Sequence, residues 1–180
     1  MTRSTFRAAA IAGLACSAAL VPVALAGAAG PAHAAAVGPC STGHLAIWLG
    51  DGEGGGTAGR TYYPLEFSNV GHSSCTLYGY PGVSAWGLDG KQIGVPASNS
   101  GASHSTVTIT PGGTAHALLA IADWGALCSK SVSALGLKVY PPGQKGAQTF
   151  SFPLAVCASR SVLVSGPVRA GVGIPGYTTS

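Results

Sequence analysis

Four of the chain's five cysteines, Cys40, Cys75, Cys128 and Cys157, follow an N-terminal segment that has the features of an export leader. Exported proteins fold in oxidising compartments, where cysteines form disulfides. None of the four stands in a Cys-x-x-Cys pair, the spacing that is typical of structural zinc sites. The layout therefore predicts a secreted domain that is cross-linked by two disulfides.

Residues 1–34 have the three parts of a secretory signal peptide. Arg3 and Arg7 are the charges of its first region, residues 8–30 form an apolar run, and Ala-His-Ala at residues 32–34 is a small-residue cleavage site. We expect cleavage after residue 34 and a mature protein that is secreted, extracellular or cell-wall associated, without stable membrane insertion.

Cys16, inside the leader, raises the alternative of a lipid anchor. A lipoprotein would carry a Leu-like residue three positions earlier, and Gly13 stands there instead. We therefore expect no lipid anchor at Cys16.

The composition excludes nucleic acid as a partner and favours strands. The chain has nine basic residues, of which two leave with the leader, and five acidic residues, so the mature charge is weak. The remaining Lys and Arg residues are scattered, whereas a nucleic-acid footprint needs them clustered. Gly is abundant, and the best helix formers other than Ala and Leu are scarce.

Apolar side chains recur in the two-residue period of β-strands. In one run, Tyr63, Leu65 and Phe67 face one way, while Glu66 is expected to face solvent. Residues 115–122 are apolar on both faces apart from His116. This pattern predicts a central strand with a packed or edge-exposed histidine that has one backbone partner. Further alternating sets are Val107 and Ile109, Leu135, Leu137 and Val139, and Phe150, Phe152 and Leu154, with outer strands at residues 45–49 and 161–165.

Turn residues separate these runs. Asp89-Gly90 predicts a hairpin, and Pro111-Gly112 predicts a turn. Pro81-Gly82 is expected to form a tight turn in which Gly82 takes a positive φ, and Asn69 is expected to bond backbone groups of the turn that follows it. The fold class is therefore all-β, an immunoglobulin-like antiparallel β-sandwich over residues 35–165 with a flexible C-terminal tail at 166–180.

Four cysteines allow three connectivities. We favour Cys40 with Cys75 and Cys128 with Cys157, the neighbours in chain order. Each pair then closes a loop whose cross-link contributes roughly 3–4 kcal/mol on the chain-entropy estimate.

One stretch resembles a known family. Phe67-Ser68-Asn69, Cys75-Thr76-Leu77 and Gly79-Tyr80-Pro81-Gly82-Val83 are similar to a family of actinobacterial secreted domains of unknown function, with a Cys-Thr-Leu-x-Gly-Tyr-Pro-Gly-Val signature. The resemblance covers residues 40–164. It implies an immunoglobulin-like sandwich in the cell envelope or outside the cell, and it implies no activity and no catalytic residues.

No residue set forms a catalytic or metal-binding signature. The Ser84 region lacks the glycine pattern of a nucleophile elbow. A Ser/His/Asp hydrolase is therefore kept only as an alternative, with Asp123 and one of four histidines, His44, His72, His104 and His116, as its candidates. A second alternative is a protease inhibitor that presents residues 73–81 as a rigid loop. We expect no enzyme activity, no metal site and no cofactor.

The remaining hypothesis is a binding module. Tyr78, Tyr80 and Trp86 are candidates for an exposed aromatic surface, because Tyr and Trp on strands form protein- or carbohydrate-binding platforms. Core filling is the simpler expectation for Trp48 and Trp86. The expected partner is an unknown protein or a cell-wall glycan.

Overall fold

The computed structural model describes residues 36–51 and 59–174 of the 180-residue chain. These residues belong to one unit, Ala35–Ser180, and the expected leader with Cys16 lies outside the described residues. Within the described ranges, no helix has the length and hydropathy needed to cross a bilayer.

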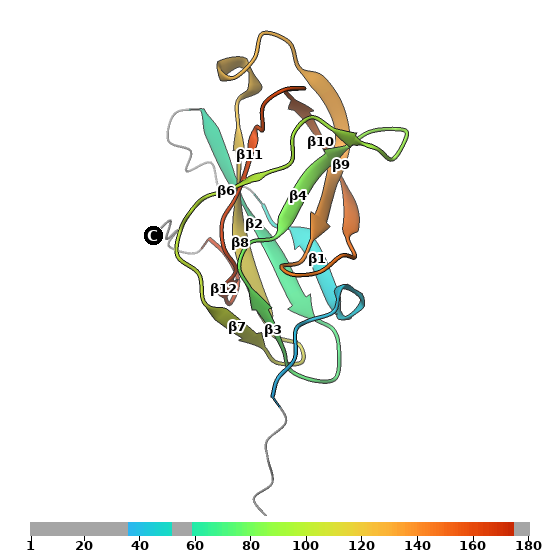
Figure 1. Ribbon diagram of the computed structural model, residues 1–180. Helices are drawn as coiled ribbons and strands as arrows, with labels where there is room; N and C mark the ends of the chain where they lie inside the picture. The colour runs from blue at the N-terminus through green and yellow to red at the C-terminus, as the bar shows by residue number, and fades with distance from the viewer. Residues whose placement is uncertain (1–35, 52–58, 175–180) are drawn as a thin grey trace, which may run out of the picture. The chain divides into compact units, whose positions relative to one another are not determined.

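The larger sheet forms around two long strands, β2 and β8, which pair in antiparallel fashion over nine positions. β1 pairs with the other side of β2, while β11 and β12 pair with successive stretches on the other side of β8. β6 completes the sheet in parallel with β11 (Figure 1). The strands of this sheet are β1 (Leu45–Leu49), β2 (Arg60–Asn69), β6 (Ser98–Asn99), β8 (Thr114–Ala122), β11 (Leu163–Ser165) and β12 (Arg169–Ala170).

A second sheet has four antiparallel strands in the order β10-β9-β4-β5, and β3 and β7 form a separate antiparallel pair. These strands are β3 (Cys75–Tyr78), β4 (Gly82–Trp86), β5 (Gln92–Ile93), β7 (Thr106–Ile109), β9 (Val132–Tyr140) and β10 (Gln148–Val156). Two short 3-10 turns, η1 (Thr42–His44) and η2 (Trp124–Ala126), complete the described elements.

One buried core draws side chains from both sheets and from the β3–β7 pair. Its largest fully buried members are Phe67, Leu65, Leu77, Ile109, Leu119, Leu137 and Leu163. They come from alternate positions of their strands, because successive side chains of a strand point to opposite faces. The expected all-β class with two disulfides is confirmed, and two sheets around one core are compatible with an immunoglobulin-like sandwich.

The strand pattern needs one correction in β9. Leu137 and Val139 are fully buried, but Leu135 is 36% exposed and Ala134 is buried in its place. The pairing of β9 with β10 shifts register between Ser151 and Leu154. Three steps of β10 there lie opposite two steps of β9, from Gly136 to Ala134, and the alternation of β9 breaks beside this bulge, where the ladder is disturbed.

The predicted turns occur with one exception. Asp89 and Gly90 lie in the hairpin between β4 and β5, and Gly112 takes a φ of 73° between β7 and β8. Gly82, however, is the first residue of β4, and the positive φ belongs to Gly79, at 97°. The left-handed backbone position therefore comes before Pro81, immediately after β3 ends.

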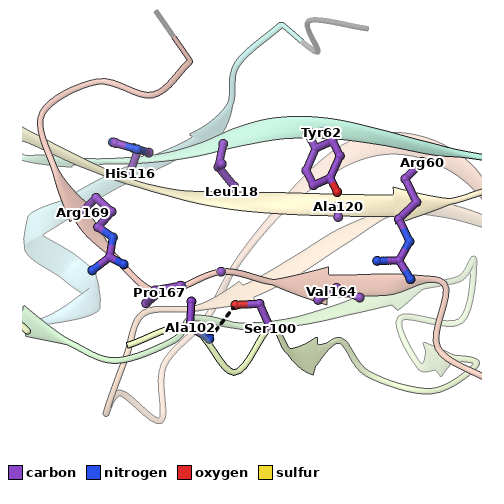
Figure 2. A pocket seen from close by; sticks show the side chains of 11 residues that line it. Arg60, Tyr62, Ser100, Ala102, His116, Leu118, Ala120, Val164, Pro167 and Arg169 are labelled. Atoms are coloured by element: carbon purple, nitrogen blue, oxygen red, sulfur yellow. Dashed lines mark hydrogen bonds between the residues drawn. The ribbon is translucent and has the colours of Figure 1, made fainter. Parts of the chain in front are cut away.

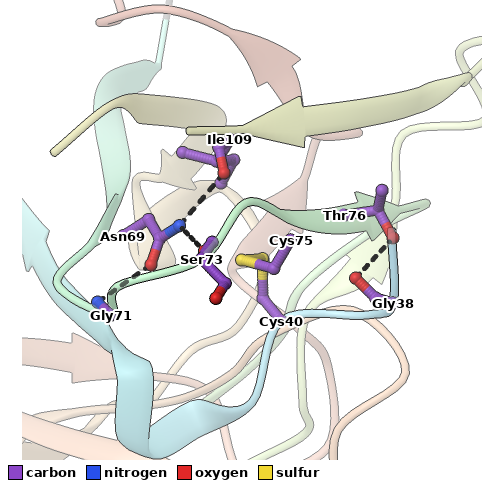
Figure 3. Close-up of a disulfide and its surroundings, with 8 residues drawn as sticks. All are labelled: Gly38, Cys40, Asn69, Gly71, Ser73, Cys75, Thr76 and Ile109. Carbon is purple, nitrogen blue, oxygen red and sulfur yellow. Dashed lines mark hydrogen bonds between the residues drawn. A yellow bond between two sulfur atoms is a disulfide. The ribbon is translucent and has the colours of Figure 1, made fainter. Parts of the chain in front are cut away.

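Asn69 anchors the turn after β2, as expected (Figure 3). Its side-chain amide donates to the carbonyl oxygens of Ser73 at 2.8 Å and Ile109 at 3.0 Å, and its Oδ1 accepts from the Gly71 N–H at 2.9 Å. The residue is 1% exposed. One buried side chain thus satisfies three backbone groups and joins the turn to β7.

Both disulfides have the favoured connectivity. Cys40–Cys75 ties the segment before β1 to β3 (Figure 3). The Cys40 N–H also donates to the carbonyl of Thr76. Cys128–Cys157 ties the loop after η2 to the residue that follows β10. Each bond therefore joins segments that are distant in sequence and adjacent in the fold.

Gln148, the first residue of β10, connects the two sheets through its side chain. Its Oε1 accepts from the Ile47 N–H at 3.2 Å, and its Nε2 donates to the carbonyls of Leu45 and of Thr42, the latter at 3.1 Å. Ile47 and Leu45 use groups on the side of β1 that faces away from β2.

The structure corrects the expectation of a flexible tail that begins at residue 166. Val168 is fully buried and its N–H donates to the carbonyl of Gly79, while Arg169 and Ala170 form β12 on β8. Backbone pairing and burial hold this part of the chain on the sheet, although its glycine and proline content is typical of a frayed end. Residues 175–180 lie outside the described residues.

We predict that Asn69→Ala lowers the free energy of unfolding by about 2–4 kcal/mol, because it leaves three buried or half-buried backbone groups without their partner. Urea denaturation of the oxidised protein measures this loss. Asn99→Ala, at an exposed position of β6, is the control and should change stability little. A loss below about 1 kcal/mol for Asn69→Ala would show that water replaces the amide easily.

The disulfide connectivity has a direct test in paired variants. Cys40→Ala with Cys75→Ala, or Cys128→Ala with Cys157→Ala, should expose no new thiol and should each lower stability by about 4 kcal/mol. Cys40→Ala with Cys157→Ala should leave two titratable thiols in the mature protein, those of Cys75 and Cys128. New thiols in either matched pair would contradict the connectivity.

Candidate binding surface

An aromatic stack stands on the surface where β3 ends. The rings of Tyr78 and His104 lie edge to face with centroids 4.7 Å apart, and those of Tyr80 and His104 lie 5.3 Å apart in the same manner. Tyr78 is 60% exposed. The Tyr80 hydroxyl donates to the carbonyl of Ala102, which fixes the inner ring. The outer tyrosine ring is thus supported from behind and open to solvent in front.

The backbone at Gly79 makes this stack possible. Its positive φ turns the chain between the two tyrosines, a conformation that side chains disfavour. Gly79 is buried, and its carbonyl accepts from the N–H of Val168 at 2.9 Å. A glycine at this position lets Tyr78 and Tyr80 pack on the same histidine.

Trp86 does not join the two tyrosines. It is the last residue of β4, whereas Tyr80 precedes that strand. The tryptophan is half-buried, and its Nε1 is buried without a hydrogen-bond partner. A Cβ at Gly136 would lie 2.8 Å from this Nε1, so the glycine leaves room for the indole. Val83 and Ala85 take the inward positions of β4, so Trp86 lies on the outer face of its sheet, opposite Gly136, and is not one of the core side chains that were expected.

Trp48 was expected to fill the core, and the structure corrects this. It is 42% exposed and lies opposite Glu66 in the register of β1 and β2. Leu45 and Ile47 take the inward positions of β1, so a residue at an even position must face outward.

A groove of about 250 Å³ crosses the outer face of the larger sheet. Arg60 and Arg169 lie at its opposite ends, with Tyr62 between them (Figure 2). We call this the arginine groove. Its lining residues are Arg60 and Tyr62 from β2, His116, Leu118 and Ala120 from β8, Val164 from β11, Arg169 from β12, and Ser100, Ala102, Gly166 and Pro167 from the flanking segments.

The groove has a cationic and partly apolar character. Leu118, Ala120, Val164 and Pro167 supply aliphatic surface, and no acidic residue is among the described side chains that line the groove. Arg169 is half-buried, and its Nη2 donates to the carbonyl of Ser103 at 2.9 Å. The backbone therefore helps to fix one of the two guanidinium groups.

One short segment joins the groove to the aromatic stack. Ala102 lines the groove and accepts the Tyr80 hydroxyl, Ser103 accepts from Arg169, and His104 lies between the two tyrosine rings. Residues 102–104 thus contact both the stack and the groove, so the two features form one continuous surface.

Residues 166–174, which we call the C-terminal strap, cross the outer face beside the groove. Gly166 N–H donates to the carbonyl of Leu118 at 2.8 Å, and the ring Nδ1 of His116 hydrogen-bonds the carbonyl of Gly171 at 2.8 Å. Further along, the N–H of Gly173 donates to Glu66 Oε1 at 2.8 Å. The strap is therefore fastened to side chains of both central strands.

Glu66 is buried, which corrects the expectation that it faces solvent. It points to the outer face as predicted, but the strap covers that face and leaves the residue 4% exposed. Its Oε2 is buried without a hydrogen-bond partner. The alternation indicated the direction of the side chain correctly, and it carried no information about a segment more than a hundred positions later.

The residues considered for other chemistries have structural roles here. His116 holds the strap, as the expectation of a histidine with one backbone partner stated, and Asp123 caps η2 by accepting from the Gly125 N–H at 3.0 Å. Residues 75–78 form β3, paired with β7, and do not protrude as the loop of an inhibitor would. Within the described ranges, no group of His, Cys, Asp and Glu has the arrangement of a metal site.

A comparison with known protein families covers most of the domain. A family model described as Domain of unknown function (DUF4232) matches residues 40–170. The chain belongs to this family. No match was found among curated proteins or among solved structures. The matched range extends past residue 164 and includes β12, in agreement with the ordered strap.

Sequence reasoning found the two tyrosines of the stack and missed both His104 as their partner and the arginine groove. Tyr78 and Tyr80 are close in sequence, so a local pattern reveals them. Arg60 and Arg169 stand near opposite ends of the domain sequence. They line the same groove only because β2 and β12 both pair with β8.

We predict that Glu66→Ala loosens the C-terminal strap, because it removes the acceptor of the Gly173 N–H. Trypsin cleavage after Arg169 should become about fivefold faster, since a lost hydrogen bond of this kind costs about 1 kcal/mol of local stability. Mass spectrometry of the released peptide measures the rate. Asp51→Ala, which removes an exposed carboxylate, should leave the rate unchanged. An unchanged rate for Glu66→Ala would mean that Glu66 does not hold the strap.

Proposed function

We propose that this domain is a non-enzymatic interaction module that works outside the cell or in the cell envelope. The observation that carries the proposal is the ring of Tyr78, which is exposed and packs on His104, which itself packs on Tyr80. Large apolar rings that are fixed before binding lose little conformational entropy on contact, which is why tyrosines recur at binding hot spots.

The partner is a protein or a cell-wall glycan. A tyrosine ring presents an apolar face to the C–H groups of a sugar or to an apolar side chain, and its hydroxyl can bond a polar group at the rim. Both kinds of partner use a supported aromatic platform, so the test must separate them.

Export to the outside of the cell is the second part of the proposal. The leader pattern at residues 1–34 and the two disulfides support it, because disulfides persist in oxidising compartments. The Cys-Thr-Leu-x-Gly-Tyr-Pro-Gly-Val run from Cys75 to Val83 supports a place among the exported actinobacterial members of the family. No specific observation favours the hydrolase or the inhibitor alternative.

We predict that Tyr78→Ala reduces retention of the oxidised protein on isolated actinobacterial cell walls by about tenfold, the effect of removing one aromatic hot spot. Cosedimentation with walls before and after protease treatment measures retention and assigns the partner to the glycan or to the protein fraction. Tyr78→Phe should retain most of the binding, because the ring remains.

Leu88→Ala is the matched control, since Leu88 is 92% exposed and lies in the β4–β5 hairpin, away from the stack. It should bind as the unchanged protein does. Equal retention of Tyr78→Ala and the unchanged protein, with the same circular dichroism, would remove the basis of the proposal.

A further inference from the structure

We propose that the arginine groove binds an acidic glycan, a linear sugar chain that carries carboxylate groups. This inference rests on the proposed binding function and names a ligand class for the second half of the same surface. It draws on the groove alone and not on the aromatic stack.

The two arginines of the groove can each contact an anionic group, one at either end. Arg60 pairs with Ala122 and Arg169 pairs with His116, so the two backbone positions are six residues apart along β8, about 20 Å at the rise of a strand. Both side chains line the groove between them. Guanidinium groups bind carboxylates through two parallel hydrogen bonds, which gives each end of the groove a specific anion contact.

The middle of the groove fits a sugar ring. Leu118, Ala120 and Val164 offer small aliphatic surface for its C–H groups, and Tyr62 and Ser100 carry hydroxyls that match its own. The volume of about 250 Å³ is below the range of pockets that enclose a drug-sized ligand, about 300–1,000 Å³. The groove therefore suits a short stretch of a longer chain that continues past both ends.

A polymer with one carboxylate on each sugar can also match the separation between Arg60 and Arg169. Its anionic groups recur along the chain, so two of them can reach Arg60 and Arg169 without a ligand of one fixed length. A short diacid would have to match the separation of the two arginines in a single molecule.

An acidic peptide is the less suitable occupant because of where the groove lies. Extended peptides bind sheet edges, where unpaired backbone groups form a new ladder. The groove crosses the face of the sheet, over β8, whose backbone is already paired with β2 on one side and with β11 and β12 on the other. A peptide there would bury backbone amides without partners, which is costly.

The test compares three polymers on the oxidised full-length chain by calorimetry: polygalacturonate, its methyl ester and poly-glutamate. The ester removes the charge and keeps the sugar backbone. We expect polygalacturonate to bind at least about tenfold more tightly than either of the others, because charge-assisted hydrogen bonds at both arginines depend on the carboxylates. Equal binding of the ester, tighter binding of poly-glutamate, or no binding of polygalacturonate would overturn the inference.

Variants locate the site. Arg60→Gln and the double change with Arg169→Gln should each weaken polygalacturonate binding, by about tenfold or more in the double variant. Arg60 is exposed, so the single variant tests the site even if the loss of Arg169 impairs folding. Arg160→Gln is the matched control, because Arg160 is exposed and does not line the groove. An equal loss in the control would reduce the effect to net charge and refute the site.

The inference and the proposed function can fail separately. Tyr78→Ala should keep polygalacturonate binding, because Tyr78 does not line the groove. Wall retention that depends on Tyr78, together with no polygalacturonate binding, would refute the groove ligand and leave the interaction module. Polygalacturonate binding that depends on Arg60, with wall retention indifferent to Tyr78, would support the groove and refute the aromatic contact.

Discussion

The antiparallel pairing of β2 with β8 is the interaction on which the rest of the domain depends. Its backbone ladder fixes nine opposed residue pairs, from Arg60 with Ala122 to Ser68 with Thr114. The inward positions of both strands, such as Leu65 and Leu119, are core residues, while the outward positions form the floor of the arginine groove. A slip of one residue would exchange these two faces, so the core fixes the register that the surface needs.

The sequence allowed accurate predictions at several places where structure follows from neighbouring residues. The alternation at Val107 and Ile109, the hairpin at Asp89-Gly90 and the capping role of Asn69 all follow from local chemistry, and the structure contains them. Chain order alone favours the disulfide pairing that the structure contains. The residues offer no physical argument against the other two connectivities. The all-β class followed from the summed pattern, because repeated two-residue periods leave little room for helices.

The failures at Glu66, the C-terminal tail and the arginine groove share one cause, which is that a local pattern cannot report what a distant segment does. Glu66 was expected in water because its side chain points away from the core, and it is buried because Gly173 lies over it. The tail was expected to be mobile because of its glycines and prolines, and β8 holds it in place. For the same reason the sequence did not indicate that Arg60 and Arg169 lie on one surface, whereas the close spacing of Tyr78 and Tyr80 did indicate a shared surface.

The contact between Gln148 and β1 has a consequence for self-association of the protein at high concentration. β1 ends the larger sheet, and an open strand of this kind can recruit a second copy and start a polymer. The amide of Gln148 already occupies the Ile47 N–H and the Leu45 carbonyl, the groups that an incoming strand would use. A single side chain from the opposite sheet thus occupies the outer edge of β1 and opposes the pairing of that edge with a second molecule.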